Sequence, residues 1–285
     1  MGIRRLIYEY RNKGLYPLYR ALWLWVKNRD VKYCYVNLKR CKEYKTSDTV
    51  FIFGSGPSVN NITWKQLEYI KSHDSFGINH IFLLKFPMTY YYLGYEPTSN
   101  ASLNALFTKD VRSVYENTLW FVPTKVFYRL YHPRIIPNFF PPNVKMVAFD
   151  YPPAVNFVKD RPFCANDFER TLVYRSTMTL VLYIVNMLGY KNIVLMGVDL
   201  HTHYHYHDHI DKVKEHRIDK GVYNHLKEGS SFEDLLPKKL AKKRTMEEYY
   251  YAVYELYFKP RGVNLYVGNK GNMLSPRIPL YPIFE

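Results

Sequence analysis

The chain has 285 residues, 47 % of them hydrophobic, so it can bury a sizeable core and is not a mainly disordered protein. Its formal net charge of +15 indicates an anionic partner, such as nucleic acid, an acidic membrane surface or a phosphorylated substrate. Its three cysteines form no CxxC pair, which argues against a disulfide scaffold and favours a reducing compartment.

Residues 1–48 form a basic segment in which apolar residues recur at roughly helical spacing, interrupted by Gly14 and Pro17. Trp23 and Trp25 lie among its basic residues, an arrangement typical of an amphipathic helix on an anionic membrane surface. A helix that packs on the main domain explains the same spacing, so both interpretations stay open. We expect the segment not to be a signal peptide, because it has no apolar stretch followed by a small-residue cleavage site, and the sequence shows no apolar run long enough to span a bilayer.

From Thr49 onward, apolar strands alternate with helices, which predicts one α/β domain over residues 49–285. Strands are expected at residues 49–54, 75–79, 88–95, 118–123, 144–150, 192–199 and 262–268, and helices at 63–72, 176–188 and 247–258. Because the strands are apolar throughout, we expect a Rossmann-like, mostly parallel sheet with helices on both faces. Residues 201–244 are largely polar, and lysine-rich toward their end, so we expect a lid-like insertion there.

Small and polar residues follow several of the predicted strands. The first strand is followed by Gly54, Ser55, Gly56, Pro57 and Ser58, the second by Asn79, and the strand at 192–199 ends in Asp199, with His201 beyond it. In a doubly wound sheet the ligand binds beyond the carboxyl ends of the strands, so these residues are candidates for one binding site. Glycines let the backbone approach a ligand, although a plain tight turn explains G-x-G-P-S equally well.

The long helix predicted at residues 176–188 begins near the same edge. Ser176 and Thr177 start it, and the N-terminus of a helix favours phosphate. Arg170 and Arg175 precede it, and a guanidinium can form a bidentate contact with a carboxylate or phosphate. Plain surface arginines are an equally good interpretation.

Four segments occur in order over most of residues 49–275: FIFGSGPSVNNI, GINHIF, YRSTMTLVLYIVNMLGYKNIVLMGVDL and GVNLYVGNKGNML. Together they resemble the bacterial CMP-sialic acid-dependent sialyltransferase family typified by the Campylobacter lipooligosaccharide enzymes. The resemblance implies a single Rossmann-like, GT-A-like domain and a CMP-activated sialic acid as donor. It also implies inversion at the anomeric carbon with no metal and no other cofactor.

The same resemblance implies roles for individual residues. Gly54, Ser55, Gly56, Pro57, Ser58, Asn79, Ser176, Thr177 and Asp199 would bind the donor nucleotide and sugar, with Ser55 standing where the family often has asparagine. His201 replaces the family's tyrosine, so Tyr204, Tyr206 and Arg175 are the candidates for holding the phosphate. The family's general-base histidine falls near Thr245; His225 is the preferred base, and His201, His209 and His216 are the others.

Alternating histidines in HTHYHYHDH, residues 201–209, leave three interpretations open: a transition-metal site, a strip that binds phosphate or acceptor, and solvated loop histidines. No D-x-D motif occurs in the chain, so we do not expect the metal ion through which many glycosyltransferases bind the donor diphosphate.

The expected function is therefore transfer of a sialic-acid-like (nonulosonic) sugar from CMP to a bacterial surface glycan, in lipooligosaccharide or capsule. The enzyme would be cytoplasmic, peripheral on the inner face of the cytoplasmic membrane. Alternatives are a transferase that uses another nucleotide sugar and a pyrophosphokinase-like nucleotide enzyme. A nucleic-acid-binding protein is less favoured, because the sequence has no RRM, KH, zinc-finger or helix-turn-helix signature.

Overall fold

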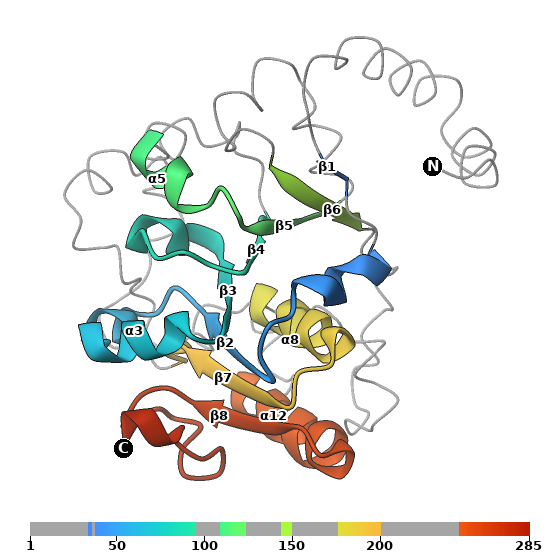
Figure 1. The fold of residues 1–285 in the computed structure, drawn as a ribbon. Coiled ribbons are helices and arrows are strands. Elements are labelled where there is room, and N and C mark those ends of the chain that lie inside the picture. The colour runs from blue at the N-terminus through green and yellow to red at the C-terminus, as the bar shows by residue number, and fades with distance from the viewer. Residues whose placement is uncertain (1–33, 36–37, 95–108, 124–143, 150–175, 201–244) are drawn as a thin grey trace, which may run out of the picture.

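Parallel strands form the centre of the molecule in a computed structural model of the chain (Figure 1). The structure describes residues 34–35, 38–94, 109–123, 144–149, 176–200 and 245–285. Within them the sheet has eight strands: β1 (Cys34–Tyr35), β2 (Thr49–Phe53), β3 (Asp74–Ile78), β4 (Tyr90–Tyr92), β5 (Leu119–Pro123), β6 (Lys145–Phe149), β7 (Asn192–Met196) and β8 (Asn264–Val267). The α-helices are α3 (Trp64–Lys71), α5 (Lys109–Val114), α8 (Thr177–Leu188) and α12 (Met246–Ala252).

The strand order is β1-β6-β5-β4-β3-β2-β7-β8, and every pair is parallel. From β2 the chain steps outward through β3, β4, β5 and β6, and then returns to place β7 on the other side of β2. The sheet is therefore doubly wound, and its direction of winding changes between β2 and β7. This arrangement confirms the predicted Rossmann-like fold.

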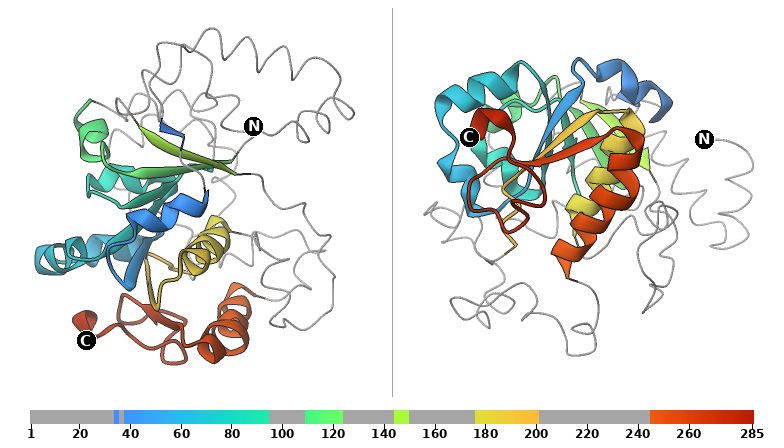
Figure 2. Two further views of the ribbon diagram at one scale, coloured as in Figure 1. Left: turned by 45° about the vertical axis from the view of Figure 1, so that its right-hand side comes forward. Right: turned by 90° about the horizontal axis from the view of Figure 1, so that it is seen from below.

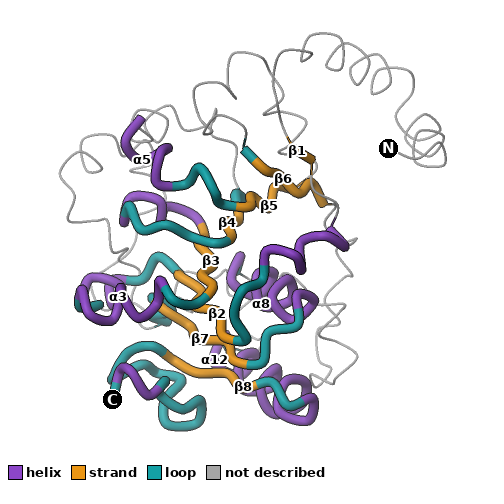
Figure 3. The backbone as a smooth tube through the Cα atoms, in the orientation of Figure 1, coloured by secondary structure: helices purple, strands orange, loops and turns teal. Residues whose placement is uncertain are grey.

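Helices cover both faces of the sheet (Figures 2 and 3). Val50 and Ile52 of β2 belong to a core that they share with α8 and α12. Phe51 and Phe53, which alternate with them, belong to a second core shared with α3 and α5. Because successive side chains of a strand point to opposite faces, a strand that is apolar throughout can fill both cores.

Local sequence signals set the ends of the helices. Thr63 caps α3 in a reciprocal capping box with Gln66, and Ser176 caps α8. Gly189 ends α8 at a φ of 79°, in the left-handed region.

The helix predicted at residues 247–258 differs in one respect, because it becomes a π-helix, η7, over Val253–Phe258. The wider turns of a π-helix bring residues four and five positions apart onto one face. Val253, Tyr257 and Phe258 are all buried in the core as a result.

Part of the predicted N-terminal segment belongs to this domain. β1 pairs with β6, and the 3₁₀ helix η1 (Leu38–Tyr44) places Cys41 in the core. Residues 1–33 and the predicted insertion at 201–244 lie outside the described residues. No helix in the described ranges is both long and apolar enough to cross a membrane.

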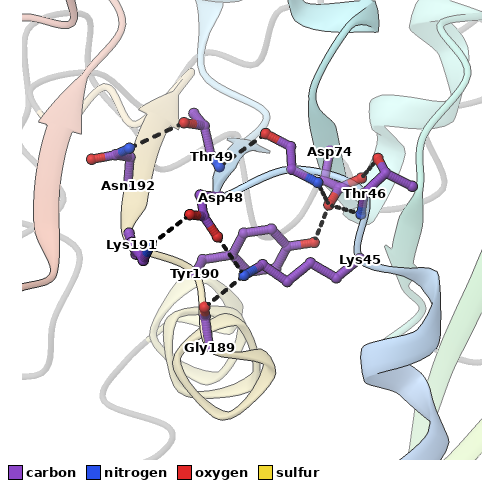
Figure 4. Close-up of polar contacts among 10 residues, drawn as sticks. Lys45, Thr46, Asp48, Thr49, Asp74, Gly189, Tyr190, Lys191 and Asn192 are labelled. Atoms are coloured by element: carbon purple, nitrogen blue, oxygen red, sulfur yellow. Dashed lines mark hydrogen bonds and ion pairs between the residues drawn. The ribbon is translucent and has the colours of Figure 1, made fainter.

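A polar network joins the amino ends of β2, β3 and β7 (Figure 4). The predicted site follows the carboxyl ends of these parallel strands, so the network lies at the opposite edge of the sheet. The buried carboxylate of Asp74 accepts hydrogen bonds from Thr46 Oγ1 at 2.7 Å and from Tyr190 Oη at 2.7 Å. It also accepts hydrogen bonds from the backbone N–H groups of Thr46 at 2.9 Å and Ser47 at 3.1 Å. Thr89 Oγ1 donates to the same carboxylate at 3.5 Å, so Asp74 has donors from three separate segments, which indicates a structural role.

Candidate functional site

The carboxyl ends of β2 and β7 lie side by side in the sheet, between β3 and β8. β2 leads toward β3 and β7 leads toward β8, so the chain leaves the pair in opposite directions. In open parallel sheets, ligands bind beyond the carboxyl ends of the strands at such a switch point. The structure therefore brings the two segments that follow Phe53 and Met196 to the position where a ligand site is expected.

Glycines let the turns after these two strands pack directly against each other. The backbone N–H of Gly54 donates to Met196 O at 2.7 Å, and that of Gly56 donates to Gly197 O at 2.9 Å. A Cβ on Gly54 would lie 2.5 Å from Gly197 O. Gly197 itself has a φ of +60°, and a Cβ on it would lie 2.7 Å from Gly54 O. The contact between the turns therefore requires these glycines, in addition to any approach of a ligand.

Ser58 and Asp199 come from different turns and are in direct contact. The backbone N–H of Ser58 donates to Asp199 Oδ2 at 2.7 Å. Asp199 Oδ1 and Ser58 Oγ are both buried, and neither has a hydrogen-bond partner among the described residues. Buried polar atoms in folded proteins nearly always have a partner, so these two atoms indicate that a ligand or a water binds here.

Helix α8 directs its N-terminus toward the same edge, because it runs antiparallel to the strands before leading into β7. Met178 Cε would lie 3.3 Å from a Cβ on Gly54, which places the first turn of α8 beside the turn after β2. Ser176 Oγ accepts from the backbone N–H of Met178 at 3.1 Å, so this hydroxyl serves as the helix cap. No acidic residue occupies the first turn, whose positive dipole end favours an anion.

Tyr250 of α12 lies against this cap. Burial raises the pKa of the Tyr250 hydroxyl, and a hydrogen bond with Ser176 opposes part of the rise. The Tyr250 hydroxyl therefore remains neutral, and its hydrogen bond with Ser176 links α12 to the start of α8.

Asn79 follows β3 at the same edge, level with Ser55 in the parallel register of β2 and β3. Its φ is +53°, a conformation that asparagine adopts more readily than most residues. Tyr91 Oη donates to its backbone carbonyl at 2.6 Å, which fixes the bend. The side chain of Asn79 makes no hydrogen bond within the described part of the chain, and its amide is available to a ligand at this edge.

The sequence assigned no role to Asn272, which the structure places in the loop after β8. Its side chain is 3 % exposed, and Nδ2 donates to Val198 O, next to Asp199, at 3.2 Å. The available signal was an asparagine between a glycine and an apolar residue, GNML, after a strand that ends at this edge.

Other predicted site residues lie outside the described residues: Arg175, His201, Tyr204, Tyr206, His209, His216 and His225. Thr245, near which the family resemblance places the base histidine, is the N-cap of α12, and its Oγ1 accepts from the backbone N–H of Glu248 at 3.2 Å. No group of three potential metal ligands occurs in the described ranges, which do not include the HTHYHYHDH tract.

No protein-family model matches the chain, and no curated protein matches it. Among solved structures, it is similar to the monofunctional alpha-2,3-sialyltransferase Cst-I from Campylobacter jejuni, with 16 % identity, a TM-score of 0.45, and coverage of 83 % of this chain and 81 % of that one.

The sialyltransferase CstII from the same organism, in complex with cytidine-5'-monophosphate, is 17 % identical, with a TM-score of 0.42 and coverage of 81 % and 84 %. A structure of CST-II with a trisaccharide acceptor and CMP is 18 % identical, with a TM-score of 0.44 and coverage of 81 % and 85 %. Likeness at this level assigns neither a family nor a reaction, so the function is inferred from the residues of this chain.

Proposed function

We propose that the protein is a glycosyltransferase that binds a CMP-activated, sialic-acid-like (nonulosonic) sugar at the switch point between β2 and β7. The proposal depends on two buried atoms, Asp199 Oδ1 and Ser58 Oγ, that have no hydrogen-bond partner within the described part of the chain and lie beside the turn that adjoins the N-terminus of α8. In nucleotide sites of this fold class, a carboxylate accepts hydrogen bonds from ribose hydroxyls, and a helix N-terminus stabilises phosphate. The order of motifs in the sequence supports cytidine and a sialic-acid-like sugar.

In the proposed reaction, a histidine removes the proton from an acceptor hydroxyl, which attacks the anomeric carbon as CMP departs with inversion. His225 is the preferred base and His201 the second candidate. Negative charge develops on the departing phosphate, where the N-terminus of α8, Arg175, Tyr204 and Tyr206 would stabilise it. The acceptor would be a lipid-linked surface glycan, which the basic N-terminal segment would approach at an anionic membrane surface.

The test is calorimetric titration with CMP, UDP and GDP, comparing wild type with Asp199→Asn. We expect CMP to bind wild type, and Asp199→Asn to weaken that binding tenfold or more, because a hydrogen bond to a charged group contributes about 1.5–3 kcal/mol. Asp48→Asn is the matched control, because Asp48 is an exposed carboxylate that precedes the other end of β2.

Wild-type protein that binds none of the nucleotides would overturn the proposal. Tighter binding of UDP or GDP than of CMP would show that the donor is a different nucleotide sugar. Hydrolysis of a CMP-sugar in EDTA tests the metal-independent mechanism, which is wrong if turnover stops and an added divalent cation restores it.

A further inference from the structure

Asn272 is connected to the proposed donor site through one peptide unit. We propose that Asn272 is a positioning residue, which holds the turn at residues 197–199 in the geometry that presents Asp199 to the donor. This inference rests on the proposed function, and it assigns to the loop after β8 a role in a site otherwise built from β2, β3, β7 and α8.

The hydrogen-bond ladder between β7 and β8 leads directly to this contact. The last backbone bond of this ladder runs from Gly268 N–H to Leu195 O at 2.9 Å. The next two carbonyls of the β7 segment accept from the turn after β2 instead. Val198 O is the next acceptor on the β8 side, and it receives Asn272 Nδ2 at 3.2 Å. The side-chain amide of Asn272 thus extends the ladder beyond the point where the two backbones separate.

The amide of Asn272 is itself held in place. Nδ2 also donates to Asn269 Oδ1 at 3.1 Å, and Oδ1 accepts from the backbone N–H of Leu274 at 3.0 Å. Leu274 is fully buried, which anchors this side of the network in the core. A side chain fixed by its own loop can restrain the carbonyl that it contacts, because moving either group breaks several bonds together.

The restraint reaches Asp199 directly, because the carbonyl of Val198 and the N–H of Asp199 belong to the same peptide unit. Asp199 Oδ2 accepts from the backbone N–H of Ser58, so that bond reports whether the carboxylate is in position. Loss of the Asn272 donor would leave Val198 O buried without a partner and free the peptide to rotate toward other donors. Asp199 would then lose its alignment with both Ser58 and the donor.

Two substitutions separate positioning from general stability. Asn272→Asp keeps the shape of the side chain and the acceptor for the Leu274 N–H, but it removes the Nδ2 group that donates to Val198 and Asn269. Asn272→Ala removes the whole amide. Asn269→Ala is the matched control, because it breaks the bond within the loop and leaves the contact with Val198 intact. Circular dichroism selects the variants that are folded at the temperature of measurement.

The first readout is amide hydrogen exchange at Ser58 in the free protein, which needs no ligand. We expect both Asn272 variants to lower the protection of this amide about tenfold or more, and Asn269→Ala to leave it near the wild-type level. Unchanged protection of Ser58 in a folded Asn272 variant would overturn the inference, whether or not CMP proves to be the ligand.

The second readout is CMP affinity in a double-mutant cycle with Asp199→Asn. Asn272→Ala should weaken CMP binding about tenfold in the wild-type background and have almost no further effect in the Asp199→Asn background. Equal effects in both backgrounds would show that Asn272 does not act through Asp199. Absence of CMP binding to wild type would overturn the proposed function, while the exchange of Ser58 would still decide the role of Asn272.

Discussion

Gly56 shows at the scale of one residue why the turn after β2 tolerates so little side-chain volume. Its φ of −69° is open to any residue, so its need for glycine is steric. A Cβ there would lie 2.5 Å from Asp199 Oδ2 and 2.7 Å from Gly197 O. We predict that Gly56→Ala lowers the free energy of unfolding by about 1–3 kcal/mol, as overpacking does, and weakens donor binding by displacing Asp199. Urea denaturation and calorimetric titration measure the two effects.

Gly262→Ala provides the contrast. Gly262 has a φ of +71°, and a Cβ added to it would meet no atom within 4 Å, so alanine there brings backbone strain without a clash. Its cost should be about 1–2 kcal/mol of stability with no change in CMP affinity. If Gly56→Ala bound CMP as tightly as Gly262→Ala does, the contact between the turns would not control the site.

Ser58 and Asp199 were predicted as site residues because each follows a strand, and parallel strands end at a common edge. Their hydrogen bond to each other was not predictable, because it depends on β7 lying next to β2, and no local pattern specifies that strand order. The role of Asn272 was missed for the same reason, since its partner Val198 is 74 residues away in the sequence.

At the scale of elements, Asp74 joins the amino ends of β2, β3 and β7. It is 1 % exposed and accepts from Tyr190 and from the segment before β2. We predict that Asp74→Ala lowers the free energy of unfolding by about 3 kcal/mol or more, because the buried hydroxyl of Tyr190 and the part-buried donors of Thr46 and Ser47 all lose their acceptor. CMP affinity of the folded variant should match wild type, since the network lies at the amino ends of the strands and the site at their carboxyl ends.

Asp48→Asn is the control for this prediction. Lys191 and Lys45 lower the pKa of the exposed Asp48 carboxyl to about 2. The ion pairs should therefore contribute above pH 4 and weaken as the pH falls toward 2, and exposed pairs of this kind contribute little. Thermal unfolding at neutral pH compares the two variants. If Asp48→Asn were as destabilised as Asp74→Ala, the structural role assigned to Asp74 would be wrong.

Most elements were predictable because their signals are local. Thr63 is a local N-cap signal for the start of α3, and Gly189 is a local signal for the end of α8. The π-helical segment Val253–Phe258 was not predicted, because the apolar and tyrosine residues there satisfy a regular helical pattern equally well. The burial of Tyr257 and Phe258 on one face depends on the core that they meet.

At the scale of the whole molecule, buried tyrosines make stability depend on pH in the alkaline range. Burial raises the pKa of four of them above the ordinary value of about 10: Tyr90, Tyr115, Tyr190 and Tyr250. Below pH 10 these groups are protonated in both states and their contribution is fully present. As the pH rises above 10, the unfolded chain releases protons that the folded protein retains, so stability falls.

We predict that the free energy of unfolding decreases above pH 10 by up to about 1.4 kcal/mol per pH unit for each tyrosine that stays protonated in the folded protein. Phenolate absorbance should show one class of tyrosines that ionises near pH 10 and a second class that ionises only as circular dichroism reports unfolding. A single class that titrates near pH 10 in the folded protein would contradict the prediction.

The pairing of β2 with β7 also constrains how a nascent chain can fold on the ribosome. Thr49 and Asn192, which lie opposite each other in the register, are 143 residues apart in sequence. Strands β2 through β6 can therefore emerge before β7 exists, with one side of β2 still lacking a partner. An uncovered apolar strand invites aggregation, so translation speed and chaperone supply should limit the yield of soluble protein.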